Sequence, residues 1–228
     1  LRAQAQPIVS FYDNLEKGQA LLAKKDFHGA VIALRYASAI NDVKKPEQLA
    51  VDFYFAMIGD AQLQAEKANW KLVKRLGEEA AKLRPQEAEP KVFIAIADKN
   101  LRFGELIGIG RAAQKKSDHP AALVSFRQAM SIIENARIRD TLASAILEYA
   151  QRTVRKGNDS TAEINDRFAA WRLIRDLTAE AQSLWRKDKV VNKDADELAA
   201  KAIVQFAHFE AFSRGLAAYR ARQFDAAL

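Results

Sequence analysis

The sequence predicts an all-α fold built from antiparallel pairs of helices, and three observations lead to this prediction. A stretch with an apolar helical run, a glycine and a short polar break occurs three times, at 18–37, 110–129 and 215–228. Alanine, leucine, lysine, arginine and glutamate dominate the composition, and these residues favour helix. No Asn-Gly or Asp-Gly turn lies between alternating apolar runs, so the usual signals of β-hairpins are missing.

The repeated stretch indicates close packing within a helix pair. Each copy has an alanine twelve residues after its glycine, and the first two copies add a larger apolar residue four positions later. Glycine inside a helix costs about 1 kcal/mol relative to alanine, so its repetition indicates a packing role. We expect each glycine to face the first alanine across two antiparallel helices, while the larger residue fills the adjoining space. The glycines are Gly18, Gly110 and Gly215, the alanines are Ala30, Ala122 and Ala227, and the larger residues are Leu34 and Phe126.

This pattern resembles the tetratricopeptide repeat (TPR), in which a Leu-Gly-x2-Tyr element precedes Ala-x3-Phe and a proline. The copies lie 92 and 105 residues apart, compared with about 34 in a regular array. We therefore place degenerate hairpins between them. The resemblance implies an α-solenoid of about five antiparallel helical hairpins, whose first helices line an extended concave surface.

Nine complete helices and the start of a tenth are expected along the chain. Their expected ranges are 7–25, 27–40, 46–63, 70–84, 91–116, 118–135, 137–156, 161–186 and 194–222. Each range contains apolar residues at helical spacing, which predicts an amphipathic helix. The second helix of each pair begins near 27, 70, 119, 161 and 224, which gives the five hairpins.

Most helix starts carry a residue that suits them, because prolines fit the first turn and short polar side chains cap it. In chain order these residues are Pro7, Asp26, Pro46, Asn69, Asp118 followed by Pro120, and Ser160 or Thr161. Pro85 stops the fourth helix, and residues 157–160 form the clearest interior loop. For Gly104 and Gly108 in the long fifth helix we expect close packing against neighbouring helices, with a bend near Gly104 as the alternative.

Length and composition limit the classes of protein to consider. The 228 residues fit one large domain or two small ones, and we expect a single TPR-like domain over 1–228. The chain begins without methionine and stops inside a repeat, which indicates a piece of a longer protein. No apolar run reaches the roughly 18 residues of a membrane span. The opening residues 3–7 resemble the start of an exported protein, so a bacterial envelope and the cytoplasm both stay open.

The sequence carries no pattern of an enzyme. The absence of cysteine excludes disulfides, thiol catalysis and cysteine-ligated zinc. His28 and His119 lie at predicted turns, where we expect capping or exposure, and no two histidines have the i, i+4 spacing of metal ligands. Neither a Gly-x-Ser-x-Gly elbow nor a phosphate-binding loop occurs. We therefore expect no catalytic residue, no metal and no cofactor.

The function that this reading favours is a protein–protein interaction scaffold, which binds a peptide or a partner helix within a larger bacterial assembly. A nucleic-acid-binding helical repeat is the first alternative, because the net charge is +7 and basic clusters lie beside Trp70 and Trp171. We favour core packing for these tryptophans, with the bases as a solvated surface. A regulatory helical domain attached to an enzyme is the second alternative.

The resemblance also implies which residues face the concave surface, namely positions three before the helix glycine and one, four and five after it. The partner-binding residues expected on this basis are Gln19, Ile107, Arg111, Gln114, Lys115, Phe212, Tyr219 and Arg220. Polar donors mixed with apolar surface suit an acidic peptide, because arginine pairs with carboxylates in a bidentate manner. The incomplete repeat at the C-terminus predicts that this end either self-associates or is capped by residues outside this sequence.

Overall fold

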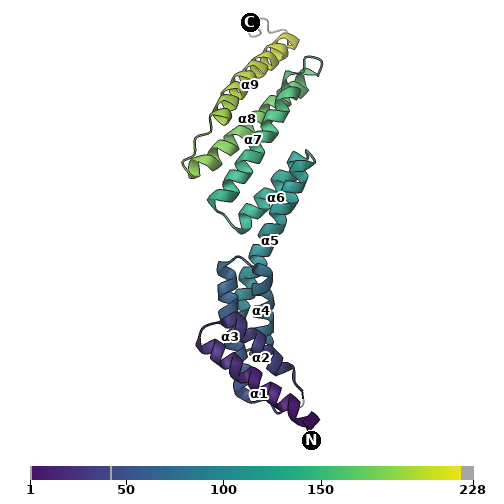
Figure 1. Ribbon diagram of the computed structural model, residues 1–228. Helices are drawn as coiled ribbons and strands as arrows, with labels where there is room; N and C mark the ends of the chain where they lie inside the picture. The colour runs from purple at the N-terminus through teal and green to yellow at the C-terminus, as the bar shows by residue number, and fades with distance from the viewer. Residues whose placement is uncertain (1, 42, 222–228) are drawn as a thin grey trace. The chain divides into compact units, whose positions relative to one another are not determined.

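The computed structural model describes residues 2–41 and 43–221, and the regular structure in these ranges is entirely helical (Figure 1). The helices are α1 (Arg2–Ala23), α2 (Phe27–Ala39), α3 (Glu47–Glu66), α4 (Trp70–Leu83), α5 (Glu89–Lys115), α6 (His119–Ile132), α7 (Ala136–Asn158), α8 (Ile164–Lys187) and α9 (Lys193–Arg220). The all-α prediction is confirmed, and consecutive helices pair as TPR-like hairpins. The expected tenth helix, with Ala227, lies outside the described residues.

The chain divides into two compact units, Leu1–Arg102 (unit 1) and Phe103–Leu228 (unit 2). Helix α5 contributes its first part to unit 1 and its second part to unit 2. The single domain expected over 1–228 stays a prediction. Unit 1 has its core between the facing sides of α1 to α4, and the largest core cluster of unit 2 is built from α6 to α9.

Three hairpins, α1–α2, α3–α4 and α5–α6, turn in the same way. Their middle turn residues Lys25, Ala68 and Ser117 have positive φ values of 60°, 55° and 61°. The residue after each donates its backbone N–H to a carbonyl five positions earlier, which is the Schellman ending of a helix. Asp26 and Asp118 then cap α2 and α6 through their side chains, as predicted.

Several predicted boundaries are wrong by less than two turns. Pro7 lies inside α1 rather than in its first turn. Gly157 belongs to α7, and Glu163 rather than Ser160 or Thr161 precedes α8. Asn69 stands at the expected cap position, but its side chain donates to Gln64 instead of accepting from the helix.

Large apolar side chains cover the repeat glycines Gly18 and Gly110. A Cβ atom added to Gly18 would meet Leu34 at 2.5 Å, and one added to Gly110 would meet Phe126 at 2.5 Å. The large residue, not the alanine that we predicted, is therefore the nearest neighbour of each glycine. Gly157 has the same relation to Trp171, whose indole Nε1 also donates to the Gly157 carbonyl oxygen at 3.1 Å.

The expected close packing of Gly104 and Gly108 is wrong. A Cβ atom added at either position would meet no atom within 4 Å among the described residues. Both glycines lie on the exposed side of α5. Their role is therefore not helix packing within the described parts of the chain.

Ion pairs link the second helices of successive hairpins in each unit. In unit 1 the Arg35 guanidinium on α2 binds Glu79 on α4. In unit 2 Arg127 on α6 donates two hydrogen bonds to Glu180 on α8, at 3.0 and 2.6 Å. Arg35 and Arg127 both stand seventeen residues after the repeat glycine, so each unit uses the same position for this link.

The two histidines at the turns differ in their surroundings. His28 is exposed, as expected, and its Nδ1 lies 3.0 Å from a carboxylate oxygen of Asp60. His119 is buried, with 5% of its surface exposed, so the expectation of capping or exposure is wrong for this residue. Its ring stacks on Tyr149 at a centroid distance of 5.5 Å, because the first turn of α6 lies against α7.

Candidate functional site

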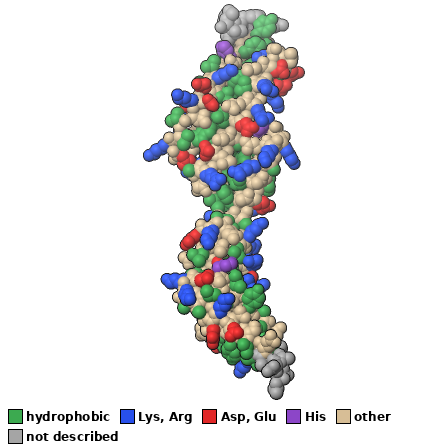
Figure 2. All heavy atoms as spheres, viewed as in Figure 1, with side chains coloured by type: hydrophobic (Ala, Val, Ile, Leu, Met, Phe, Trp, Pro, Cys, Tyr) green, Lys and Arg blue, Asp and Glu red, His purple; other side chains and the backbone are tan. Residues whose placement is uncertain are grey.

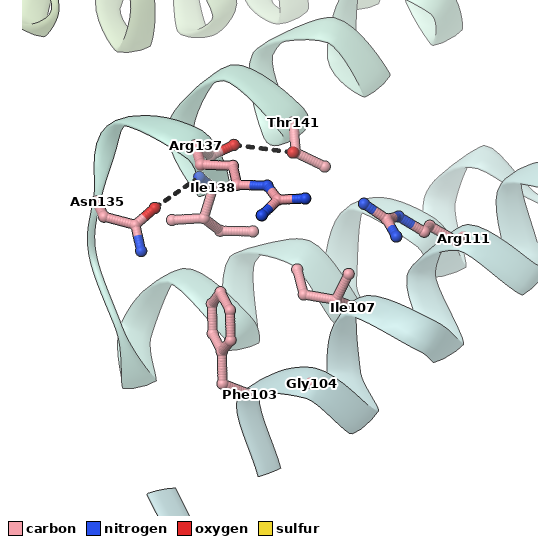
Figure 3. Close-up of a pocket in the computed structure, with 8 residues that line it drawn as sticks. All are labelled: Phe103, Gly104, Ile107, Arg111, Asn135, Arg137, Ile138 and Thr141. Atoms are coloured by element: carbon pink, nitrogen blue, oxygen red, sulfur yellow. Dashed lines mark hydrogen bonds between the residues drawn. The ribbon is translucent and has the colours of Figure 1, made fainter. Parts of the chain in front are cut away.

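A pocket of about 380 Å³ lies between the second part of α5 and the start of α7 (Figure 3). All of its lining residues belong to unit 2. They are Phe103, Gly104, Ile107, Arg111, Asn135, Arg137, Ile138 and Thr141. We call this set the α5–α7 groove. It contains two of the predicted partner-binding residues, Ile107 and Arg111.

Apolar side chains form the floor of the groove. Ile138 on α7 is buried, with 1% exposed, and the partly buried Phe103 and Ile107 of α5 pack against the same small core cluster. Gly104 has no side chain on the α5 side of the pocket, so the backbone of α5 borders the pocket there. The floor thus offers an apolar surface that remains open on one side.

The start of α7 is fixed by local hydrogen bonds. The Asn135 side chain caps the helix by accepting from the backbone N–H of Ile138 at 3.0 Å. The Thr141 hydroxyl donates to the backbone oxygen of Arg137 at 2.8 Å. Both side chains therefore serve the backbone of α7, and the Arg137 guanidinium projects from this hydrogen-bonded first turn (Figure 3).

Two arginines converge on the groove. Figure 3 shows the guanidinium groups of Arg111 and Arg137 pointing toward one another across the pocket. Within residues 2–41 and 43–221, neither guanidinium has a carboxylate or other hydrogen-bonding partner. Arg139, two positions from Arg137, instead binds both Asp188 and Glu134. The groove thus concentrates positive charge that the described part of the chain does not neutralise.

Beyond the pocket, the next predicted residues on α5 are Gln114 and Lys115. The Gln114 amide donates to Glu148 on α7, and Glu148 also pairs with Arg152 at 3.2 Å. Lys115 is exposed. Gln114 is therefore engaged in holding α5 to α7, while Lys115 is open to solvent.

The other predicted residues lie elsewhere in the fold. Gln19 on α1 of unit 1 donates to Asp52 on α3 at 2.8 Å. Phe212, Tyr219 and Arg220 lie on the exposed C-terminal part of α9. None of these four residues lines the α5–α7 groove.

Sequence reasoning missed the α7 side of the groove. Arg137 and Thr141 stand four residues apart and follow a strong cap residue, Asn135. Their spacing places them on one face of a helix, and this could have been read from the sequence. We assigned no repeat glycine to the fourth hairpin, so none of its residues was predicted to face the groove. Its glycine, Gly157, packs on Trp171 near the end of α7 instead.

The basic cluster beside Trp171 does not form a base-stacking surface. Trp171 is fully buried, which confirms the expected core position, and Trp70 is half-buried. Arg175 lies over the ring of Phe206 at 4.0 Å, so this cation is engaged within the fold. Figure 2 shows lysine and arginine side chains interspersed with acidic ones on the visible face.

The described residues contain neither a cluster of metal ligands nor a helix that could span a membrane. No group of three or more histidine, cysteine, aspartate or glutamate side chains there is arranged to hold a metal ion. No helix within those residues is both long and apolar enough to cross a membrane.

Comparison with known proteins gives one distant likeness. No family model matches the sequence, and no curated protein matches it. Among solved structures, the chain is similar to a TPR repeats protein from Bacteroides fragilis NCTC 9343. The TM-score is 0.40 and the sequence identity 14%, over 85% of this chain and 98% of that chain. Such a distant likeness carries no conclusion about this chain, whose helical hairpins are evident from their own packing.

Proposed function

We propose that this chain is a protein-interaction scaffold that binds an acidic segment of a partner protein in the α5–α7 groove. The observation that carries the proposal is the convergence of Arg111 and Arg137 on one apolar pocket without a carboxylate partner. The segment supplies the carboxylate, and its apolar neighbours cover Phe103 and Ile107.

The energetics favour an anionic ligand at this place. Two like charges that point toward one another repel, and a bound carboxylate replaces that repulsion with attraction. Hydrogen bonds from a guanidinium to a carboxylate contribute about 1.5–3 kcal/mol each, more than bonds between neutral groups. The apolar floor adds area-dependent affinity that a free ion cannot use.

A protein segment fits the groove better than a nucleic acid. Binding of single strands relies on exposed aromatic rings on which bases stack. Trp171 is buried and Phe206 is covered by Arg175, so neither ring is available to stack on a base beside the arginines of α8. A pocket with an apolar floor between two helices suits an extended peptide that alternates apolar and acidic side chains.

Other predicted features extend this proposal. Lys115 continues the positive side of α5 beyond the pocket, and Phe212, Tyr219 and Arg220 offer exposed aromatic and basic contacts on α9. Gln19 is part of the corresponding surface in unit 1. We propose that the scaffold works within a larger bacterial assembly at the cell envelope, and that its C-terminal repeat associates with a second copy.

Fluorescence anisotropy with labelled ten-residue peptides tests the proposed function. Three amidated peptides alternate leucine with glutamate, glutamine or lysine. We expect the glutamate peptide alone to bind well, and the double variant Arg111→Gln, Arg137→Gln to weaken it by at least about tenfold. The matched control, Arg172→Gln with Arg214→Gln, removes the same charge from exposed positions outside the groove.

The same assay can contradict the proposal. Equal binding of the glutamate peptide by the double variant and the wild type would exclude the arginine pair as its site. Tighter binding of a labelled RNA oligonucleotide, falling steeply with salt, would favour the nucleic-acid alternative instead.

A further inference from the structure

Helices α3 and α7 occupy equivalent places in the two units, since each is the first helix of its unit's second complete hairpin. Pro46 stands at the N-cap of α3 and Asn135 at the N-cap of α7. Aligned on these caps, the two helices bury largely the same apolar positions. The buried apolar pairs are Leu49 and Ile138, Phe53 and Leu142, Tyr54 and Ala143, Ala56 and Ala145, Met57 and Ile146, Ile58 and Leu147, and Ala61 and Ala150.

The alignment relates the groove of unit 2 to a set of residues in unit 1. Gln48 corresponds to Arg137, and Asp52 corresponds to Thr141. Gln19 corresponds to Arg111, because each follows its repeat glycine directly.

In unit 1 these positions hold a carboxylate. Gln19 Nε2 donates to one oxygen of Asp52 at 2.8 Å, and Gln48 Nε2 donates to the other at 2.7 Å. The Asp52 side chain is buried between α1 and α3, with 8% exposed. The fold therefore places one donor from each of two neighbouring first helices on the two oxygens of a single carboxylate.

In unit 2 charged guanidinium donors replace the neutral amide donors of unit 1, and a threonine replaces the carboxylate that accepts from them. Arg111 and Arg137 take the places of the two amides, and Thr141 takes the place of the aspartate. The Thr141 hydroxyl is used by the α7 backbone, so it does not satisfy either guanidinium. Gly104 stands where unit 1 has Tyr12, and with no side chain at this position the α5 backbone borders the pocket.

We infer that the α5–α7 groove binds one aspartate or glutamate side chain of a partner segment at the place where unit 1 holds its own Asp52 carboxylate. The inference rests on the proposed function and specifies it. Arg111 and Arg137 each donate to that carboxylate, and Thr141 leaves room for it. An apolar neighbour of the acidic residue enters beside Gly104 and covers Phe103.

The variant Thr141→Asp tests this inference without removing either arginine. It places a carboxylate at position 141, where unit 1 has Asp52. This internal carboxylate then pairs with Arg111 and Arg137 in place of the peptide. We expect the variant to bind the amidated leucine–glutamate peptide at least about tenfold more weakly and to unfold at no lower temperature than the wild type. The control Thr141→Asn has nearly the same shape without the charge, and we expect it to retain binding within about twofold.

A second variant covers the case in which Thr141→Asp fails to fold. Gly104→Tyr restores the ring that Tyr12 provides in unit 1, on an exposed helix face where no atom lies within 4 Å of the added Cβ. We expect this variant to keep its helical content and to bind the peptide more weakly, because the ring closes the entry to the pocket.

The outcomes separate the two proposals. If the double arginine variant loses binding while Thr141→Asp and Gly104→Tyr bind like the wild type, the groove binds acidic segments but the inferred carboxylate position is wrong. If no variant changes binding, both proposals fail. Binding that requires a free C-terminal carboxylate, and is absent for the amidated peptide, would also overturn the assignment to a side chain.

Discussion

Replacing Gly110 with alanine probes the packing of α5 against α6 most directly. A Cβ atom at this position would lie 2.5 Å from Cε1 and 2.7 Å from Cδ1 of Phe126. The Phe126 ring is fully buried, so it cannot move without displacing its neighbours. Gly108 provides a matched control two residues earlier on the same helix, because an added Cβ there meets no described atom within 4 Å.

The magnitude follows from two opposing effects. Alanine gains about 1 kcal/mol of helix propensity over glycine at either position. Overpacking of a filled core costs about 1–3 kcal/mol, and only Gly110→Ala incurs this cost. The propensity gain cancels in the comparison, so we expect Gly110→Ala to be less stable than Gly108→Ala by about 1–3 kcal/mol. Gly108→Ala itself should be about 1 kcal/mol more stable than the wild type.

Urea unfolding, followed by both circular dichroism and tryptophan fluorescence, measures this difference. The denaturant midpoint should shift while the m-value stays constant, because neither change alters the surface exposed on unfolding. If the two units unfold separately, the shift should appear in the transition of unit 2. A Gly110→Ala variant as stable as Gly108→Ala would refute the packing described for this hairpin.

Two further predictions concern the turns and the loop before α9. Ser117 has φ near 61°, a conformation that costs a non-glycine residue about 1–2 kcal/mol. We therefore expect Ser117→Gly to raise the melting temperature. The control Lys116→Gly, at the end of the helix, should lower it. Hydrogen bonds from Arg139 hold the pKa of Asp188 below its ordinary value of 3.8. A lowered folded-state pKa means that the ion pair stabilises the fold above the unfolded pKa and that this stability is lost as the pH falls through the folded one. Asp188→Asn should therefore destabilise at pH 7, and in acid titrations this effect should fade as the pH falls below 3.8; a pH-independent effect would contradict this reasoning.

The helices and the tight turns were predictable because their signals are local. Caps such as Asp26 and Asp118 act on the first turn that follows them. The repeat glycines Gly18 and Gly110 also pointed to close packing, since a helical glycine is costly without a packing role. Composition and apolar spacing together were therefore sufficient for the fold class.

The groove was only half predictable because its two sides come from different hairpins. Arg111 was identified from its place beside a repeat glycine, but Arg137 and Thr141 belong to a hairpin to which no repeat glycine was assigned. Their relation to Gln48 and Asp52 of unit 1 depends on aligning helices by their caps and buried faces.

Other misses have the same cause. Burial of His119 depends on the ring of Tyr149, thirty residues later in the chain. The open surroundings of Gly104 and Gly108 depend on which helices fail to approach α5. Such long-range contacts leave no local trace in a single sequence.

A crystal structure of the chain bound to the amidated leucine–glutamate peptide tests the central claim most directly. We predict one glutamate carboxylate within about 3 Å of both the Arg111 and Arg137 guanidinium groups, with an adjacent leucine over Phe103. A peptide bound outside the α5–α7 groove, or one whose glutamates all face solvent, would contradict the account.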